Sequence, residues 1–163
     1  MHLRAAVPDD AELLTELVVE AVNWTGEVRT TREQVMADPA LSHYVTGWKR
    51  PTDFGLVAVA DDGAPLGAVW ARLFADDEPG YGFIAHDIPE VSMAVLPGNR
   101  GAGVGGALLR GCIEQARMVG CAALSLSVED GNDVARGLYE RHHFSVVGRT
   151  GASATLRLDV WGA

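Results

Sequence analysis

The sequence predicts an α/β fold built on a mixed, mostly antiparallel sheet. Segments of strand length alternate with segments of helical periodicity along all 163 residues. The turn signal Asp61–Pro65 separates two strand-like segments, which indicates a hairpin. Over residues 90–128 a strand-like run, a glycine-rich loop, a helical segment and a second strand follow one another. This order predicts one parallel step in the sheet.

The N-terminal part is expected to form one strand and two helices. His2–Val7 is strand-like, and Pro8–Asp10 begins a helix because proline suits its first positions and acids favour its first turn. One apolar face follows at helical spacing, formed by Leu13, Leu14, Leu17, Val18, Ala21 and Val22. Thr30 and Glu33 have the spacing of a capping box, so a second short helix is expected over Thr31–Asp38.

The rest of the chain is expected to add six strands and two helices around the polar loop Asp76–Pro89. The expected strands are Phe54–Ala60, Leu66–Phe74, Glu90–Leu96, Ala122–Val128, Phe144–Arg149 and Ala154–Trp161. The helices are expected over about Val104–Val119, before Gly120, and over Val134–Arg141. No repeat or linker interrupts this order. The sequence therefore predicts a single domain over residues 1–163, with about seven strands and about four helices.

Composition narrows the classes of function. The net charge is −9 and Lys49 is the only lysine, which argues against a nucleic-acid surface and suits a cationic acceptor. No apolar stretch approaches the ~18 residues of a membrane span, and the N-terminus lacks a secretory apolar segment, so a cytoplasmic location is expected. Cys112 and Cys121 have no His or Cys at metal-ligand spacing, so they are expected to be inert thiols and no metal is expected. Whether the protein is a monomer or a homodimer stays open.

The glycine-rich loop is the most informative segment. Gly101, Gly103, Gly105 and Gly106 stand immediately before a helical segment, where free backbone N–H groups and the helix dipole favour phosphate. Arg100 adds a fixed positive charge with a forked set of donors. The loop therefore predicts a site for a phosphorylated small molecule.

The glycine-rich loop has three other interpretations. Two are phosphate-binding motifs that fit this sequence less well, and the third is a purely structural glycine-rich turn. Gly101-x-Gly103-x-x-Gly106 matches the dinucleotide fingerprint, but about 100 residues precede it and no acid follows at the spacing that bonds a ribose. A Walker A loop is excluded because no Lys-Ser/Thr pair follows the glycines.

The loop resembles the coenzyme A pyrophosphate loop of the GNAT superfamily of N-acetyltransferases. The family pattern Arg/Gln-x-x-Gly-x-Gly/Ala is met by Arg100, Gly103 and Gly105. Downstream, residues 127–144 resemble the family's strand-5 and helix-4 signature, with Asn132, Ala135 and Tyr139 at its spacing. His143 stands where that signature has glycine. A turn there requires either an unfavourable backbone angle at this histidine or a different geometry.

The resemblance covers the whole chain and implies a GNAT-like fold whose fourth and fifth strands, Glu90–Leu96 and Ala122–Val128, are parallel and splayed. It implies acetyl-CoA as co-substrate, with the pantetheine arm between those strands. An N–H near Met93–Ala94 would polarise the thioester carbonyl. The implied cofactor-binding residues are Met93, Ala94, Val95, Arg100, Gly101, Ala102, Gly103, Val104, Gly105, Gly106, Asn132, Ala135 and Tyr139.

Acyl transfer to an amine needs a base for the protonated amine and an acid for the departing thiolate. Tyr139 shares a helix face with Asn132 and Ala135, and in the resembling enzymes that face looks onto the thioester sulfur. Proton transfer from a phenol with a pKa of ~10 to the thiolate of a thiol with a pKa of ~8.5 is unfavourable by only ~2 kcal/mol. Glu90 opens the central strand, where family members often carry a base that acts through water. The alternative to a catalytic role is that Tyr139 is a core residue and that Glu90 is a solvated carboxylate at the start of its strand.

Other polar residues are weaker candidates for the chemistry. His86 and Asp87 are alternative bases, whereas Glu129 is expected to be structural or to contact a substrate. His142 and His143 close a helix, and Asn132 is also a suitable helix N-cap. The resemblance places the acceptor pocket among Trp24, Glu27, Tyr44, Trp48, Asp76, Asp77, Glu78, Tyr81 and Phe83.

These observations together predict an enzyme, an acetyl-CoA-dependent N-acetyltransferase that acts on a primary amine of a small molecule or protein. The alternative is a non-catalytic acyl-CoA-binding sensor or partner-binding module on the same fold. A dinucleotide-dependent oxidoreductase is the third possibility. The joint presence of Glu90 and Tyr139 favours the enzyme.

Overall fold

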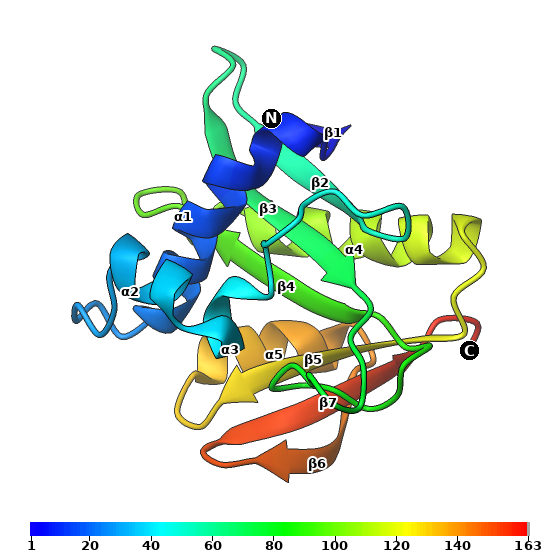
Figure 1. Cartoon of the computed structure of the whole chain (residues 1–163). Coiled ribbons are helices and arrows are strands. Elements are labelled where there is room, and N and C mark those ends of the chain that lie inside the picture. Colours follow the sequence, from blue (N-terminus) through cyan, green and yellow to red (C-terminus); the bar gives the residue numbers. More distant parts are fainter. Residues whose placement is uncertain (163) are drawn as a thin grey trace.

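A seven-stranded mixed sheet organises the chain in the computed structural model, which describes residues 1–162 (Figure 1). Its strands are β1 His2–Ala5, β2 Phe54–Val59, β3 Pro65–Arg72, β4 Glu90–Val95, β5 Ala123–Glu129, β6 Ser145–Thr150 and β7 Ser153–Asp159. The helices are α1 Ala11–Val22, α2 Arg32–Ala37, α3 Pro39–Ser42, α4 Val104–Met118 and α5 Asp133–Arg141, and a 3-10 turn spans Pro8–Asp10.

The strand order is β1-β2-β3-β4-β5-β7-β6, and only β4 and β5 run parallel to each other. The β4–β5 ladder contains a single register pair, Glu90 with Ser125, after which the two strands separate. By contrast, β3 pairs with β4 along all of β4. The predicted fold, including the parallel and splayed fourth and fifth strands, is confirmed.

Two layers of helices cover the two faces of the sheet (Figure 1). On one face α4 and α5 pack on alternate residues of the strands, among them Val69, Val91, Leu124 and Leu126. On the other face α1 to α3 enclose a second core around Trp70, which is 1% exposed. Because side chains alternate along a strand, Glu90, Ser92 and Ala94 of β4 lie on the α1–α3 face.

The structure corrects several expected boundaries. The capping box of α2 is Thr31 with Gln34, one residue later than expected, because Thr31 Oγ1 accepts from the Gln34 N–H at 3.3 Å. The short helix α3 was not expected. It begins where the Asp38 side chain accepts from the Ala40 N–H, and its four residues are too few to show a period. The first strand ends at Ala5 rather than Val7, which is the N-cap of the 3-10 turn.

His143 adopts the unfavourable backbone angle that its place in the signature requires. Its φ is +73°, in the left-handed region, and it is the only non-glycine residue among residues 1–162 with a positive φ. The Phe144 N–H donates to the Tyr139 carbonyl at 3.2 Å, as at a helix end that usually closes on glycine. Helix α5 therefore ends in the left-handed backbone conformation that glycine usually adopts, although the residue there is a histidine.

Candidate active site

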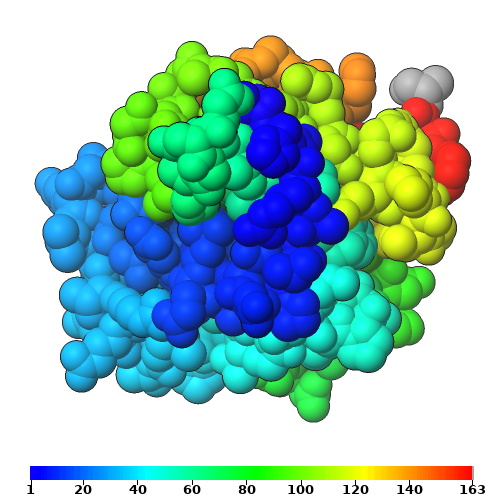
Figure 2. Space-filling view, turned by 90° about the horizontal axis from the view of Figure 1, so that it is seen from above, coloured from blue at the N-terminus to red at the C-terminus, as the bar shows by residue number. Residues whose placement is uncertain are grey.

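The glycine loop has the backbone conformation that its sequence predicts. Gly101 and Gly103 have φ values of +80° and +84°, and a Cβ at either would meet nothing within 4 Å. Within the described residues, no amide N–H from Gly101 to Gly106 donates to another group of the protein. Gly103 is the N-cap of α4, so these donors stand without a protein acceptor at the positive end of a 15-residue helix. In Figure 2 this segment, in yellow-green, lies at the molecular surface.

Gly105 has a different function in the loop, because it holds two helices together. A Cβ at Gly105 would lie 3.2 Å from Leu138 Cδ2, tighter than most contacts of a real side chain. The glycine therefore lets α4 approach α5 closely, next to Met93 and Val95 of β4.

Arg100 is half exposed and rests against neighbouring segments. Its Nε donates to the Val95 carbonyl at 3.4 Å, and its guanidinium lies 3.7 Å from Glu20 Oε2 on α1. Both contacts are long, so little holds the side chain in this position. The arginine is free to turn toward an anion on the loop.

The edge of β4 beyond Glu90 carries unpaired backbone groups. The Leu96 N–H donates to Leu66 on the β3 side, so by alternation the N–H groups of Met93 and Val95 face the gap beside β5. The Ala94 N–H faces β3 instead. Of the two residues expected to polarise a thioester, the geometry therefore favours Met93.

Glu90 is buried in a hydrogen-bonded chain on the α1–α3 face. It is 3% exposed, and its Oε2 accepts from the Tyr44 hydroxyl at 2.5 Å. The Tyr44 oxygen in turn accepts from the Tyr81 N–H at 2.8 Å. The second carboxylate oxygen, Oε1, makes no hydrogen bond of standard geometry and lies against Gly80, where a Cβ would be 2.2 Å away.

Burial raises the pKa of Glu90 from 4.5 to about 7, with the hydrogen bond from Tyr44 and the Gly82 N–H acting in the opposite direction. Burial and the neighbouring Glu90 raise the pKa of Tyr44 well above 10, so Tyr44 remains a donor. A carboxylate with a pKa near neutrality has the basicity that suits a general base at neutral pH. The solvated carboxylate expected as the alternative for Glu90 is wrong.

Tyr139 lies on the opposite face of the sheet, in the core beneath α5. The residue is 8% exposed, packs edge-on against Phe144, and forms no hydrogen bond through its hydroxyl with residues 1–162. Burial raises its pKa to about 12. Proton donation to a thiolate of about 8.5 then requires about 5 kcal/mol, more than twice the value expected from an unperturbed phenol.

Asn132 is the N-cap of α5, where its side chain accepts from the Ala135 N–H at 3.4 Å. Glu129 joins β5 to the segment after α1, because it accepts from the Trp24 indole at 3.2 Å and pairs with Arg29 at 2.9 Å. This contact supports the structural reading of Glu129.

The other candidates lie outside the Glu90–Tyr44 chain. His86 and Asp87 are exposed in the loop before β4 and make no hydrogen bond to that chain within the described residues. The Trp48 indole donates to the Val7 carbonyl, so Trp48 also has a structural contact. Cys112 is fully buried, and burial raises its pKa to about 12, consistent with an inert thiol.

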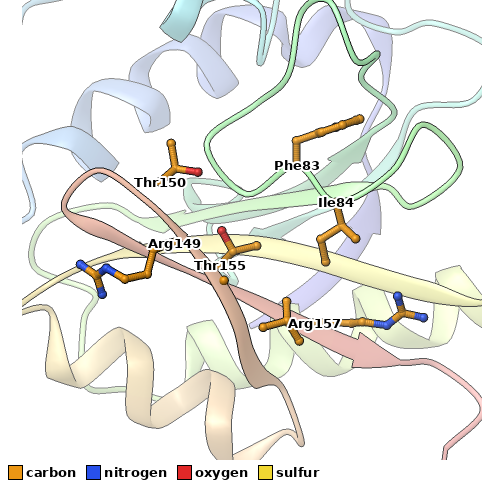
Figure 3. Close-up of a pocket in the computed structure, with 8 residues that line it drawn as sticks. Phe83, Ile84, Arg149, Thr150, Thr155 and Arg157 are labelled. Carbon is orange, nitrogen blue, oxygen red and sulfur yellow. The ribbon is translucent and has the colours of Figure 1, made fainter.

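Two cavities that share Phe83 and Thr150 lie near the loop before β4 and the β6–β7 hairpin, and Figure 3 shows the first of them. One has a volume of about 330 Å³ and is lined by Phe83, Ile84, Val147, Gly148, Arg149, Thr150, Thr155 and Arg157. The other, of about 340 Å³, is lined by Ala40, Pro79, Gly80, Tyr81, Phe83 and Thr150. Tyr81 and Phe83 were expected at the acceptor pocket. The two arginines were not, because nothing in the sequence of the hairpin marks them.

Within residues 1–162, no helix is long and apolar enough to cross a bilayer. No cluster of three or more His, Cys, Asp or Glu side chains in the same range is placed to hold a metal ion.

Solved structures with the same fold are N-acetyltransferases. The ribosomal-protein-alanine N-acetyltransferase of Brucella melitensis is 22% identical, with a TM-score of 0.69 over 98% of this chain and 99% of that chain. A phosphinothricin acetyltransferase of Sinorhizobium meliloti, solved with acetyl-CoA, is 22% identical, with a TM-score of 0.69 over 97% and 87%. The spermidine/spermine N-acetyltransferase of Vibrio cholerae is 17% identical, with a TM-score of 0.61 over 98% and 94%.

The search of curated proteins by sequence found no match. The model of the acetyltransferase (GNAT) family matches residues 18–144, which include the glycine loop, Glu90 and Tyr139. Because that match covers more than half of the chain and agrees with the fold, the protein belongs to the GNAT acetyltransferase family.

Proposed function

We propose that residues 1–163 form one catalytic domain that transfers an acetyl group from acetyl-CoA to a primary amine. The observation that supports this best is the continuity of unpaired backbone groups. The free N–H groups of Gly101–Gly106 adjoin the open β4 edge at Met93 and Val95. The N–H groups of the loop suit a diphosphate, and the open β4 edge suits an extended arm that contains amides.

The fit of coenzyme A depends on backbone and on one movable side chain. Arg100 exchanges its long contact with Glu20 for a phosphate oxygen, a stronger charge-assisted hydrogen bond. The N–H and C=O groups of Met93 and Val95 bond the pantetheine amides in place of a neighbouring strand. We propose that Asn132 and Ala135, at the start of α5, also contact the pantetheine arm.

The proposed chemistry is direct transfer. Glu90 accepts the proton of the acceptor ammonium, the free amine nitrogen bonds to the thioester carbon, and the Met93 N–H stabilises the developing oxyanion. The carbon–sulfur bond then breaks, the nitrogen loses its second proton to solvent, and Tyr139 protonates the departing thiolate. Glu90 and Tyr139 lie on opposite faces of the sheet, and we propose that each acts on one side of the reacting carbonyl.

The test measures thermal stabilisation of the protein by acetyl-CoA and, for comparison, by NADH. Acetyl-CoA at about 100 times its Kd should stabilise the protein by about 2.7 kcal/mol, a rise in Tm of roughly 5–10 °C for a chain of this length. Arg100→Ala should weaken binding by about 1.5–3 kcal/mol. A rise with NADH and none with acetyl-CoA would contradict the proposal. Acetyl-CoA binding without turnover on any amine would favour the acyl-CoA sensor.

A further inference from the structure

We propose that the acceptor is an amine that also carries an anionic group, a carboxylate or a phosphate-type group, and that Arg157 binds this group. The site is the 330 Å³ cavity between the loop before β4 and the β6–β7 hairpin. This inference rests on the proposed function and specifies its acceptor.

The cavity is basic although the protein is acidic. The chain has a net charge of −9, yet two arginines and two threonines line this cavity and none of its lining residues is a carboxylic acid. Phe83 and Ile84 lie across the open cavity from Arg157, so the rest of its lining adds no negative charge (Figure 3). A polyamine would find no carboxylate among these residues, whereas an anion finds donors.

The two arginines differ in how many donors they have free. Both terminal nitrogens of Arg149 point to Asp130, and its side chain is directed away from Ile84 (Figure 3). Arg157 uses only its Nε, which donates to Asp159 at 3.0 Å. Its two terminal nitrogens make no hydrogen bond with residues 1–162, so a forked pair of donors is available for a planar carboxylate or a phosphate.

The sheet register connects Arg157 to Glu90. Ser125 of β5 is the register partner of Glu90 on β4 and of Arg157 on β7, so the three side chains rise from one face in one row. Two strand spacings, about 10 Å, separate the outer pair of this row. The Ser125 hydroxyl between them is fully buried and has no hydrogen-bond partner within the described residues.

The second cavity continues the first toward Glu90. The two share Phe83 and Thr150, and the second is lined by Gly80, directly beside Glu90 Oε1. An acceptor whose anionic group is on Arg157 would extend its amine through the second cavity toward Gly80, which covers the buried Glu90 Oε1. The short span of the row favours a molecule of amino-acid size, with the amine and the acid a few bonds apart.

The test compares amino acids with their own carboxamides, which keep the amine and the side chain and remove only the negative charge. Binding of each to coenzyme A-saturated protein is measured by calorimetry, and acetylation by thiol release from acetyl-CoA, with spermidine included. We expect at least one amino acid to have a Kd at least about tenfold lower, and a kcat/KM at least about tenfold higher, than its own carboxamide.

Arg157→Met should remove that preference, mainly through KM, and leave the carboxamides within about twofold. Arg157→Lys should restore part of it, because the charge returns without the fork. Arg136→Met is the matched control, since Arg136 is also a half-exposed, ion-paired arginine but lies on α5, on the other face of the sheet. Arg136→Met should change the binding and the kcat/KM of neither the amino acids nor their carboxamides.

The outcomes separate this inference from the proposed function. Arg157-dependent binding of amino acids without any acetylation would support the inference and contradict the proposed function. Efficient acetylation of spermidine or of carboxamides, with no gain for any amino acid, would support the proposed function and overturn the inference. Equal loss for both classes in Arg157→Met would also overturn it.

Discussion

Burial of Glu90 makes the stability of the protein depend on pH in a predictable direction. The pKa of this carboxyl is about 7 in the folded protein and 4.5 unperturbed, a difference of about 2.5 units. At about 1.4 kcal/mol per unit, the folded state loses about 3 kcal/mol of stability as the pH rises from below 4.5 to above 7. The sign follows because the folded state holds the proton over this interval and the unfolded state does not.

The substitution that tests this is Glu90→Gln, which keeps the size and shape of the side chain and removes its titratable carboxyl group. We expect the Tm of the variant to rise relative to the parent by roughly 6–12 °C between pH 4.5 and pH 8, measured by calorimetry. The comparison must be a difference between the two proteins. His43 titrates in the same interval with the opposite sign, because burial lowers its pKa below 6.5 and favours the folded state as the pH rises.

Glu27→Gln is the control, because Glu27 is an exposed carboxylate on the segment after α1. It should change the free energy of unfolding by less than about 0.5 kcal/mol at any pH. A Tm difference between Glu90→Gln and the parent that is constant from pH 4.5 to pH 8 would contradict a raised pKa of Glu90 in the folded protein. It would mean that Glu90 is solvated in the folded protein and is not the poised base proposed above.

Three further substitutions test other parts of the account. Tyr139→Phe should lower kcat by about 10²-fold or more while acetyl-CoA binding stays within twofold; an unchanged kcat would exclude it as the acid. His143→Gly should stabilise the fold by about 1 kcal/mol in urea unfolding, because it removes a positive φ from a side-chain-bearing residue, and a loss of stability would contradict this. Arg72→Met should destabilise by about 1.5–3 kcal/mol, since the buried Asp53 loses the Arg72 guanidinium at 3.1 Å and keeps its contacts with Arg50, and a variant as stable as the parent would be inconsistent with a buried pair.

The sequence was sufficient for the fold because its signals are local. Periodicity located the strands, and the glycines marked the loop between β4 and α4. The resemblance also indicated that His143 could require an unfavourable angle, which the structure confirms with φ at +73°.

The site could be predicted only in part, because its energetics depend on residues far apart in the chain. Glu90 and Tyr44 are 46 residues apart, and the burial that raises the pKa of Glu90 comes from packing that no local pattern encodes. Arg157 has the same limitation. Its relation to Glu90 follows from the register of β4, β5 and β7, which only the folded sheet defines.

The most direct test of the central claim is acetyl-CoA-dependent thiol release across a panel of amines, with the parent protein compared with Gly103→Val. The variant places a branched side chain at a φ of +84°, where the loop must face the diphosphate, and it changes no charge. We expect turnover on at least one primary amine by the parent, and loss of acetyl-CoA binding and turnover together in the variant. Turnover and binding that survive unchanged in Gly103→Val would contradict it.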